Sequence, residues 1–567
     1  FKIDGKPVKW NYYNKHIDVA ILHLNKPLKT KEKIVIETPF YVKIPSGKFS
    51  RLGHVGQSYQ ITQWFPKPAV FDKNGWHPLY YLDQGEFFSE YGSYDVKITL
   101  PENYVIMATG DLVDGEKEVE FLNNKVRLTE EKIKNNALPT KDTLGRKDMS
   151  FPKSSEQFKT VHFRQNNVHD FAWFADKRYH VLSGEVELPK SKRKVKTWAL
   201  FTNQEAHLWT KSIEYLNDAT NYFSKWVGEY PYNHVTAVDG TISAGGGMEY
   251  PNITVIGNSY TAHALETVII HEVGHNWFYG ILGSNERDHA WMDEGMNTYI
   301  EIRYMEEKYN GQFMNIPLLN LKDKNVQEAT YRFNASRNYD QPLKMGSEAF
   351  TEFNYGGMVY AKTGIGFHYL KAYLGEELFD KCMNSYFDKW KFKHPKPEDL
   401  EIIFEEKSGK NLDWFFDGYI NTSQKTDYTF KSLKKINEKD YLIKIKNKTG
   451  YNSPVLIQSI KNNNDSNEIL EEFWIDGFKK DTSIVLSTKN NPDKFAMDIN
   501  QSTTDFNHSK NTLNTSGLFK TWKPIGLKLI PYDNNTTKNY IHWLPILGYN
   551  YNDKTMLGLS LYNKSAF

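Results

Sequence analysis

Apolar and polar residues alternate along the first third of the chain. Runs such as IDVAILHL (17–24) and YDVKITL (94–100) place apolar side chains at every second position, with Pro, Gly and Asn between the runs. A period of two is typical of strands that bury one face, and short strands separated by turn residues form antiparallel sheets. We therefore expect an N-terminal antiparallel β domain over residues 1–196, within a multidomain α+β chain.

From about residue 197 the period lengthens to that of a helix. The segment 203–228 carries apolar residues at helical spacings and ends on Gly, as an amphipathic helix does. Helical patterns continue to about residue 424, and one of them, ALETVIIHEVGHNWFYGILG, contains HEVGH at 271–275. The pattern predicts a mostly helical domain over 197–424, with HEVGH in the middle of a helix.

Strand patterns return after residue 424. YLIKIKN (441–447), SPVLIQSI (453–460) and TSIVLST (482–488) are separated by clusters of Asn, Asp and Gly. These runs predict a small β-sandwich over 425–505. In the last segment, 506–567, a strand, an Asn-Asp turn and alternating Leu residues predict a linker followed by a partial β-hairpin.

Composition narrows the range of functions. The 567 residues are too many for a single hydrophobic core. The charges nearly balance, with 71 Lys and Arg against 69 Asp and Glu, so we expect no nucleic-acid partner. Only one Cys, Cys382, is present, so His and carboxylate side chains must carry any metal. Because Phe1 lies inside a strand pattern and no initiator Met precedes it, we expect the chain to be a fragment.

The HEVGH sequence and a downstream glutamate predict a metal site. On a helix, His271 and His275 lie one turn apart on the same face, close enough for both imidazoles to reach one ion. Glu294, nineteen residues after His275, supplies the third ligand that a catalytic zinc with one open position requires. The alternative is a pair of core histidines, but 17 His in 567 residues give only about 0.06 chance matches to H-[DE]-x-x-H.

A second carboxylate follows on the same predicted helix face. Glu301 lies two turns beyond Glu294. From there it is placed to accept the free ring N–H of a ligand histidine and to fix the tautomer of that ring. The alternative for Glu301 is an ordinary surface carboxylate.

Together these residues resemble the HExxH-(x)18-E signature of the aminopeptidase N family of zinc peptidases, part of the gluzincin group. The resemblance implies that His271, His275 and Glu294 bind one Zn²⁺ per chain, and that Glu301 supports a ligand from behind. It also implies a thermolysin-like fold for the catalytic domain 197–424. The likeness covers roughly residues 1–500.

Two further segments are similar to motifs of the same family. SAGGGMEYP (243–251) resembles the family's G-x-M-E-N exopeptidase motif, with Tyr250 where Asn is usual, and implies substrate-binding roles for Gly246, Gly247, Met248 and Glu249. VYAKTG resembles the family's Y-x-K-G segment and implies that Tyr360 is the catalytic tyrosine, with Tyr355 as the rival candidate.

The segment ITQWFPKPAVFD (61–72) resembles the family's T-Q segment, which lines the pocket for the substrate amine. Gln63 matches the Gln of that segment. Two residues later the family often has Gln or Glu, whereas this chain has Phe65. The resemblance therefore leaves the second anchor for the amine without a candidate.

These residues predict hydrolysis of peptides that have a free N-terminus. Glu272, between the two histidines, is the expected general base, and the Tyr360 hydroxyl is expected to stabilise the oxyanion. Glu249 is expected to pair with the substrate ammonium and so to restrict cleavage to the first residue. A thermolysin-like endopeptidase, a lipid epoxide hydrolase and an inactive zinc-holding binding module are the alternatives.

The last segment also carries a hypothesis about location. IHWLPILGYNYNDKTMLGLSLYN (541–563) alternates Leu with Gly and Ser and resembles the first strands of an outer-membrane barrel. The resemblance predicts a bacterial peptidase of the cell envelope, in the periplasm or held at the outer membrane by a further C-terminal region. An ordinary soluble hairpin and a cytoplasmic location are the alternatives.

Overall fold

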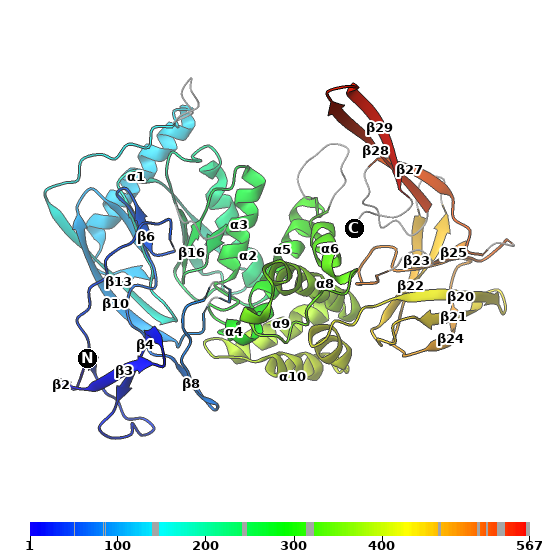
Figure 1. The fold of residues 1–567 in the computed structure, drawn as a ribbon, viewed down its shortest axis with the longest axis horizontal. Coiled ribbons are helices and arrows are strands. Elements are labelled where there is room, and N and C mark those ends of the chain that lie inside the picture. Colours follow the sequence, from blue (N-terminus) through cyan, green and yellow to red (C-terminus); the bar gives the residue numbers. More distant parts are fainter. Residues whose placement is uncertain are drawn as a thin grey trace. The chain divides into compact units, whose positions relative to one another are not determined.

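The computed structural model divides the chain into two compact units (Figure 1), each described by itself. The first comprises Phe1–Tyr304, Gly346–Glu348 and Met383–Lys396, and the second comprises Met305–Met345, Ala349–Cys382 and Pro397–Phe567. The structure describes the whole chain except residues 50, 83, 86, 139–146, 241–245, 313–321, 463–466, 507–510, 518–519, 530–538 and 563–567, and the side chains of 528, 529 and 562.

The first unit opens with small antiparallel sheets, which confirms the predicted N-terminal β domain in outline. The two larger sheets have the orders β11-β14-β7-β6 and β10-β13-β12, and they share a core that includes Ile106, Phe163 and Ala175. The strands are β1 (Lys2–Ile3), β2 (Lys6–Pro7), β3 (Lys9–Tyr13), β4 (His16–His23), β5 (Ile36–Glu37), β6 (Gly53–Val55), β7 (Ser58–Ile61), β8 (Val70–Asp72), β9 (Gly75–His77), β10 (Gly92–Pro101), β11 (Val105–Ala108), β12 (Asp111–Leu112), β13 (Phe158–Val168) and β14 (Trp173–Asp176).

This β region also contains a helix that the period of two did not predict. The helix α1 (Glu116–Lys134) buries Leu122 and Val126 one turn apart, with Glu118 and Thr129 extending the same stripe. The buried stripe is narrow and the rest of the helix is charged, so the helical period is weak. The segment was therefore assigned to strands like the segments on either side of it. Leu122 and Val126 pack in one core with residues of β11, β14 and the next sheet.

A five-stranded mixed sheet follows, with the order β15-β16-β17-β19-β18. The predicted boundary at residue 196 falls inside β16. This strand pairs with β15 on one side and with β17 on the other, so the boundary would divide one sheet. The edge strand β18 pairs antiparallel with β19. The strands are β15 (His180–Glu187), β16 (Lys194–Phe201), β17 (His234–Asp239), β18 (Gly247–Met248) and β19 (Ile253–Ile256).

Helices dominate the chain from residue 209 to 420, in agreement with the predicted helical region. In the first unit, α2 lies against β15, β16 and β17, and α3 lies against β17, β18 and β19. The helices are η1 (Trp209–Lys211), α2 (Ser212–Trp226), α3 (Ala262–Gly274), α4 (Glu286–His289), η2 (Ala290–Met292), α5 (Glu294–Tyr309), α6 (Asp323–Ala335), η3 (Ser347–Ala349), α7 (Glu352–Asn354), η4 (Tyr355–Lys362), α8 (Thr363–Leu374), α9 (Glu376–Trp390), α10 (Pro397–Ser408) and η5 (Trp414–Ile420).

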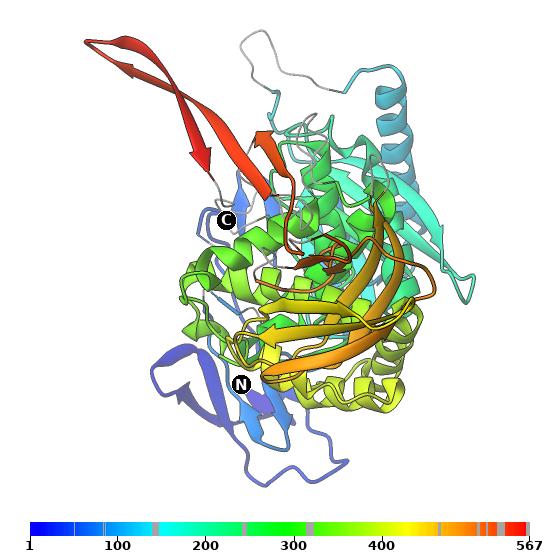
Figure 2. The same ribbon diagram turned by 90° about the vertical axis from the view of Figure 1, so that its right-hand side faces the viewer.

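In the second unit two sheets pack face to face, with the orders β20-β21-β24 and β23-β22-β25-β26. Both contribute to one core, which includes Ile443 and Ile445 from the first sheet and Ile457 and Phe495 from the second. Figure 2 shows these strands in yellow and orange. They are β20 (Tyr428–Lys435), β21 (Asp440–Asn447), β22 (Val455–Asn462), β23 (Asn467–Ile475), β24 (Asp481–Ser487), β25 (Lys494–Met497) and β26 (Thr512–Asn514), so the second sheet runs past residue 505.

The last described strands are β27 (Ile525–Leu529), β28 (Asn539–Asn550) and β29 (Lys554–Tyr562). β28 and β29 form an antiparallel hairpin in which Leu547 faces Leu557 across the strands. Both of these leucines are more than 70% exposed. Over the described part of the chain, no helix is both long enough and apolar enough to cross a membrane.

Candidate active site and metal centre

The helix α3 carries the first two predicted ligands at its C-terminal end. Thr261 caps its start by accepting a hydrogen bond from the backbone N–H of Ala264, and Leu265 and Ile269 lie on its buried face. The helix ends at Gly274, and His275 is its C-cap residue. The prediction that HEVGH lies in the middle of a helix is therefore wrong, although the helical turn that joins the two histidines is present.

Close packing explains why this helix end meets α5. A Cβ atom at Gly274 would collide with Phe223 of α2 and Asn297 of α5. Only glycine at this position therefore lets α2 and α5 pack so closely against α3. The Asn297 side-chain amide donates a hydrogen bond to the backbone oxygen of His271, with an N···O distance of 2.7 Å. This contact fixes the start of α5, and with it Glu294, against the end of α3.

The three predicted ligand atoms form a nearly equilateral triangle. Nε2 of His271 lies 3.1 Å from Nε2 of His275, and Oε2 of Glu294 lies 3.2 Å from the first nitrogen and 3.3 Å from the second. A tetrahedral zinc ion with bonds of about 2.0–2.1 Å separates its ligand atoms by about 3.3 Å. The triangle therefore has the size that such an ion needs, and two imidazoles with one carboxylate are a donor set of catalytic zinc.

A carboxylate stands behind each ligand histidine. Nδ1 of His275 lies 2.6 Å from Oδ1 of Asp293, and Nδ1 of His271 lies 3.2 Å from Oε2 of Glu301. A carboxylate at Nδ1 leaves Nε2 free to bind metal and holds the ring in that orientation. The sequence pointed to Glu301 but missed Asp293, although Asp293 directly precedes Glu294.

The same carboxylates control the charge of the histidines in the absence of metal. Burial disfavours the charged form of His271, but hydrogen bonds to Glu294 and Glu301 outweigh burial and raise its pKa to about 10. The pKa of His275 is likewise raised well above its usual range, since the charges of Asp293 and Glu294 overcome burial. The cluster thus attracts positive charge strongly, and a divalent cation would displace protons on binding.

Two further predicted residues lie beside the ligand triangle. Glu249, Glu272 and His275 each present an oxygen or nitrogen atom within 4.8 Å of the others, and all three are buried. Glu249 directly follows the edge strand β18. The predicted base and the predicted ammonium partner are thus brought together at one side of the metal ligands.

The glycines of the GGMEY segment differ sharply in their surroundings. A Cβ at Gly247 would lie 2.5 Å from Cδ and Cγ of Glu272, whereas a Cβ at Gly246 would meet only Val268, at 3.8 Å. Gly247 therefore leaves the space that the Glu272 side chain occupies. The preceding residues 241–245, which include part of the predicted motif, lie outside the described residues. Met248 is the second residue of β18, and its side chain is buried in the core of the sheet.

Gln63 adopts a left-handed backbone conformation, with φ of +49°, and lies next to the same motif. Its side-chain oxygen accepts a hydrogen bond from the Tyr250 hydroxyl at 3.3 Å. Tyr250 stands where the resembling family has Asn, and here it anchors Gln63. The neighbouring Phe65 packs edge-on against Trp64 and Tyr94, so its ring belongs to the hydrophobic core.

The predicted catalytic tyrosine belongs to the second unit. Tyr360 lies in the π-helical segment η4, half-buried, with its ring centroid 5.9 Å from that of Tyr355. Both candidate tyrosines therefore occupy the same short segment, and the role of Tyr360 stays a prediction.

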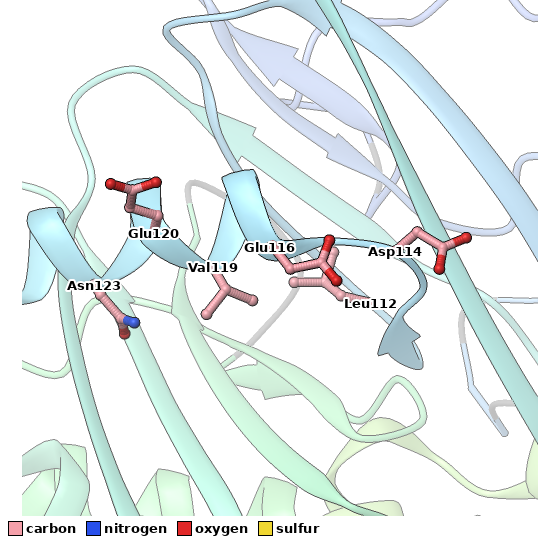
Figure 3. A pocket seen from close by; sticks show the side chains of 7 residues that line it. Leu112, Asp114, Glu116, Val119, Glu120 and Asn123 are labelled. Atoms are coloured by element: carbon pink, nitrogen blue, oxygen red, sulfur yellow. The ribbon is translucent and has the colours of Figure 1, made fainter.

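A separate hollow lies at the start of α1 (Figure 3). Asp114, Glu116 and Glu120 contribute to its lining, together with Leu112, Val119 and Asn123. None of the predicted site residues lines it, and its carboxylates are those of an exposed helix N-terminus. The hollow is thus distinct from the metal centre.

Comparison with known proteins finds that part of the chain is similar to peptidases. Residues 209–419 match the model of the peptidase family M1 domain. The chain is 27% identical over 157 residues to aminopeptidase N of Lactococcus lactis, covering 27% of this chain and 18% of that protein. It is 26% identical over 190 residues to leucine aminopeptidase 2 of Yarrowia lipolytica, covering 32% of this chain and 28% of that protein. The matches thus span less than a third of the length of either relative.

Among solved structures, the fold is similar to that of Legionella pneumophila aminopeptidase A in complex with aspartic acid. The TM-score is 0.56 at 14% sequence identity, and the superposition covers 81% of this chain and 48% of the Legionella chain. At this identity the likeness concerns the fold alone.

Proposed function

We propose, from the premise that the chain carries a peptidase family M1 domain of the aminopeptidase N type, that it removes N-terminal residues from peptides. The observation that carries this proposal is the ligand triangle of His271, His275 and Glu294, with separations of 3.1 to 3.3 Å. Glu272 and Glu249 lie at its side, where a base and an ammonium partner are needed.

Zinc bound at this triangle would supply a Lewis acid that polarises the scissile carbonyl and lowers the pKa of water toward about 7. Glu272 takes the proton of the attacking water and delivers it to the leaving amine. Its position fits this role, because a carboxylate oxygen of Glu272 lies within 4.8 Å of a ring nitrogen of His275 and the residue is almost wholly buried. Asp293 and Glu301 hold the two imidazoles in place through their Nδ1 atoms.

Glu249 restricts cleavage to the first residue of a peptide. The nitrogen of an amino acid lies only about 2.5 Å from its own carbonyl carbon. A carboxylate that binds the free ammonium must therefore lie close to the base, as Glu249 does. The edge strand β18, which ends just before Glu249, offers backbone groups with which an extended substrate can pair.

Tyr360 completes the proposal as the donor that stabilises the oxyanion. Its support is the similarity of VYAKTG to the family motif. Loss of one such donor in other enzymes costs about 2.7 to 4 kcal/mol in activation free energy. Tyr360→Phe is therefore expected to lower kcat about 100- to 1,000-fold, and Tyr355→Phe is its matched control.

The test is release of free amino acid from matched unblocked and N-acetylated peptides, with and without a chelator. Wild type should cleave only the unblocked set, and chelator should abolish this cleavage. Glu272→Gln should be inactive while retaining its metal. Glu266→Gln is the matched control, because Glu266 is also a buried glutamate of α3, bonded to Tyr304 away from the ligands.

Two of the alternative functions give different outcomes in this assay. Equal cleavage of acetylated peptides would indicate an endopeptidase of the thermolysin type. No cleavage by metal-loaded protein would favour a zinc-holding binding module instead. Either result would overturn the proposed aminopeptidase.

A further inference from the structure

The segment VYAKTG contains a lysine that the proposed mechanism does not use. Lys362 is the last residue of the π-helical segment η4, and 0% of its surface is exposed. A lysine is almost never fully buried unless its amino group has a partner. Tyr360, two residues earlier in the same segment, is only half-buried. The contacts of Lys362 therefore bear on the stretch of backbone that carries the proposed oxyanion donor.

The partner of Lys362 is the backbone at the end of a second π-helical segment. Nζ of Lys362 donates a hydrogen bond to the backbone oxygen of Thr422, with an N···O distance of 2.8 Å. Thr422 follows η5, and its hydroxyl donates in turn to the backbone oxygen of Gly418 within η5. The side chain of Lys362 thus ties the end of η4 to the end of η5.

A second hydrogen bond runs in the opposite direction between the same two segments. The Tyr419 hydroxyl donates to the backbone oxygen of Lys362 at 2.9 Å, and Nζ of Lys362 lies 4.9 Å from the centroid of the Tyr419 ring. Gly366 makes room for this contact, because a Cβ atom there would collide with the Tyr419 ring. Lys362 and Tyr419 therefore form a reciprocal clamp, in which each segment holds the backbone of the other.

The clamp does not depend on the charge of Lys362. Burial lowers the pKa of its amino group to about 7; the charge of Asp340 opposes this effect and the charge of Lys425 adds to it. Asp340 is itself paired with Lys425, at 3.0 Å. The ammonium group and the neutral amine both carry N–H bonds, so either form donates to Thr422. The contacts thus point to a role in holding the backbone.

Tyr360 and Lys362 point to different sides of η4, since residues two apart on a helical segment do not face each other. Their burial agrees, because Lys362 is enclosed and Tyr360 is partly exposed. One short stretch of backbone therefore carries the clamp on one side and the Tyr360 ring on the other. π-Helical turns are rare and are frequent at functional sites.

We propose that Lys362 is a positioning residue for Tyr360. By holding η4 against the end of η5, its side chain fixes the backbone from which the Tyr360 hydroxyl reaches the oxyanion. The inference rests on the proposed aminopeptidase function and on the role proposed there for Tyr360. Lys362 touches no substrate, so its loss lowers kcat and leaves substrate binding nearly unchanged.

The test is a double-mutant cycle between Lys362→Met and Tyr360→Phe in metal-loaded protein. Methionine keeps an unbranched side chain and removes the N–H donors. Because a misplacement of about 1 Å in a catalytic group can cost about 100-fold in rate, we expect kcat for an unblocked peptide to fall about 10- to 100-fold in Lys362→Met, with KM within about threefold of wild type. In the Tyr360→Phe background the same change should lower kcat less than about twofold, because the hydroxyl that Lys362 positions is already gone.

Tyr419→Phe breaks the other half of the clamp and keeps the ring. It should also lower kcat only when Tyr360 is present, and it decides the outcome if Lys362→Met does not fold. Lys324→Met is the matched control, because Lys324 is also a buried lysine whose amino group donates to a backbone oxygen, that of Gln501. This control should keep kcat within about twofold of wild type.

The outcomes separate the inference from the function on which it rests. If wild type releases no amino acid from any unblocked peptide, the proposed function fails. If Tyr360→Phe is as active as wild type, Tyr360 is not the donor and the positioning role falls with it. An equal loss of kcat from Lys362→Met with and without the Tyr360 hydroxyl would indicate a general disturbance of the fold and would overturn the inference alone, as would wild-type kcat in Lys362→Met.

Discussion

Gly247→Ala tests the placement of the proposed base directly. A Cβ at this position would lie 2.5 Å from Cδ and Cγ of Glu272, while ordinary van der Waals contact begins near 3.4 Å. The Glu272 side chain would therefore have to move by about 0.9 Å, the difference between these distances. Because Glu272 is only 7% exposed, it has little room to move without changing its direction.

The expected consequence is a loss of activity without loss of the fold. A misplacement of about 1 Å in a catalytic group can cost about 100-fold in rate. We therefore expect kcat for an unblocked peptide to fall about 100-fold in Gly247→Ala. Overpacking of this kind costs about 1–3 kcal/mol of stability, and the ligand triangle contains no atom of Gly247, so zinc content should be unchanged.

The neighbouring glycine provides the control. In Gly246→Ala the new Cβ would meet only Val268, at 3.8 Å, which is ordinary contact. This variant should keep kcat within about threefold of wild type, since no atom of Glu272 has to move, while loss of a substrate contact at Gly246 would raise KM instead. The reasoning would be refuted if Gly247→Ala, folded and zinc-loaded, were as active as Gly246→Ala. In Glu272→Gln the proposed base is already lost, so adding Gly247→Ala should have no further effect. A further 100-fold loss of the residual activity would also refute the reasoning.

Three other changes follow from the structure. Asp293→Asn should weaken zinc binding about 10- to 100-fold in competition with a chromogenic chelator, because Asp293 holds the ring of His275; unchanged affinity would argue against that role. Adding zinc at about 1,000 times its Kd to protein stripped of metal should raise the free energy of unfolding in urea by about 4 kcal/mol. Glu272→Gln should be stabilised by the same amount. An equal stabilisation of His271→Ala would contradict the ligand assignment. Burial lowers the pKa of Lys362 to about 7, so the folded state favours the neutral amine and the free energy of unfolding should increase as pH rises from 7 toward 10.5. Lys362→Met should reduce this increase, measured by urea unfolding at pH 7 and pH 9.5. An unaltered increase in the variant would assign the pH dependence to other groups.

The sequence brought the predicted ligand residues together correctly because local geometry determines their placement. One helical turn brings His271 and His275 together whatever surrounds them, and Glu294 begins the helix that Asn297 ties to the end of α3. The helical and β regions were likewise visible from their periods. The end of α3 at Gly274 was not, because it depends on close packing with Phe223 and Asn297, which are distant in sequence.

The sequence missed residues whose roles depend on tertiary contacts. Asp293 and Glu294 are adjacent, yet only the fold decides that one side chain faces His275 from behind while the other faces the metal position. Periodicity also could not choose between Tyr355 and Tyr360, because both lie in one irregular segment.

The balance of charge links the metal, the base and the proposed substrate site. Carboxylates crowd around two histidines in the first unit: Glu249, Glu272, Glu286, Asp293, Glu294 and Glu301. A single divalent ion neutralises only part of this charge, so the site should still favour a second cation once zinc is bound. A peptide with a free N-terminus carries that cation at the distance from its first carbonyl where Glu249 lies, and an acetylated peptide does not. The negative charge that strengthens metal binding would thereby also select the substrate, which is why a charge-removing and shape-preserving variant of Glu249 is the most informative one to make.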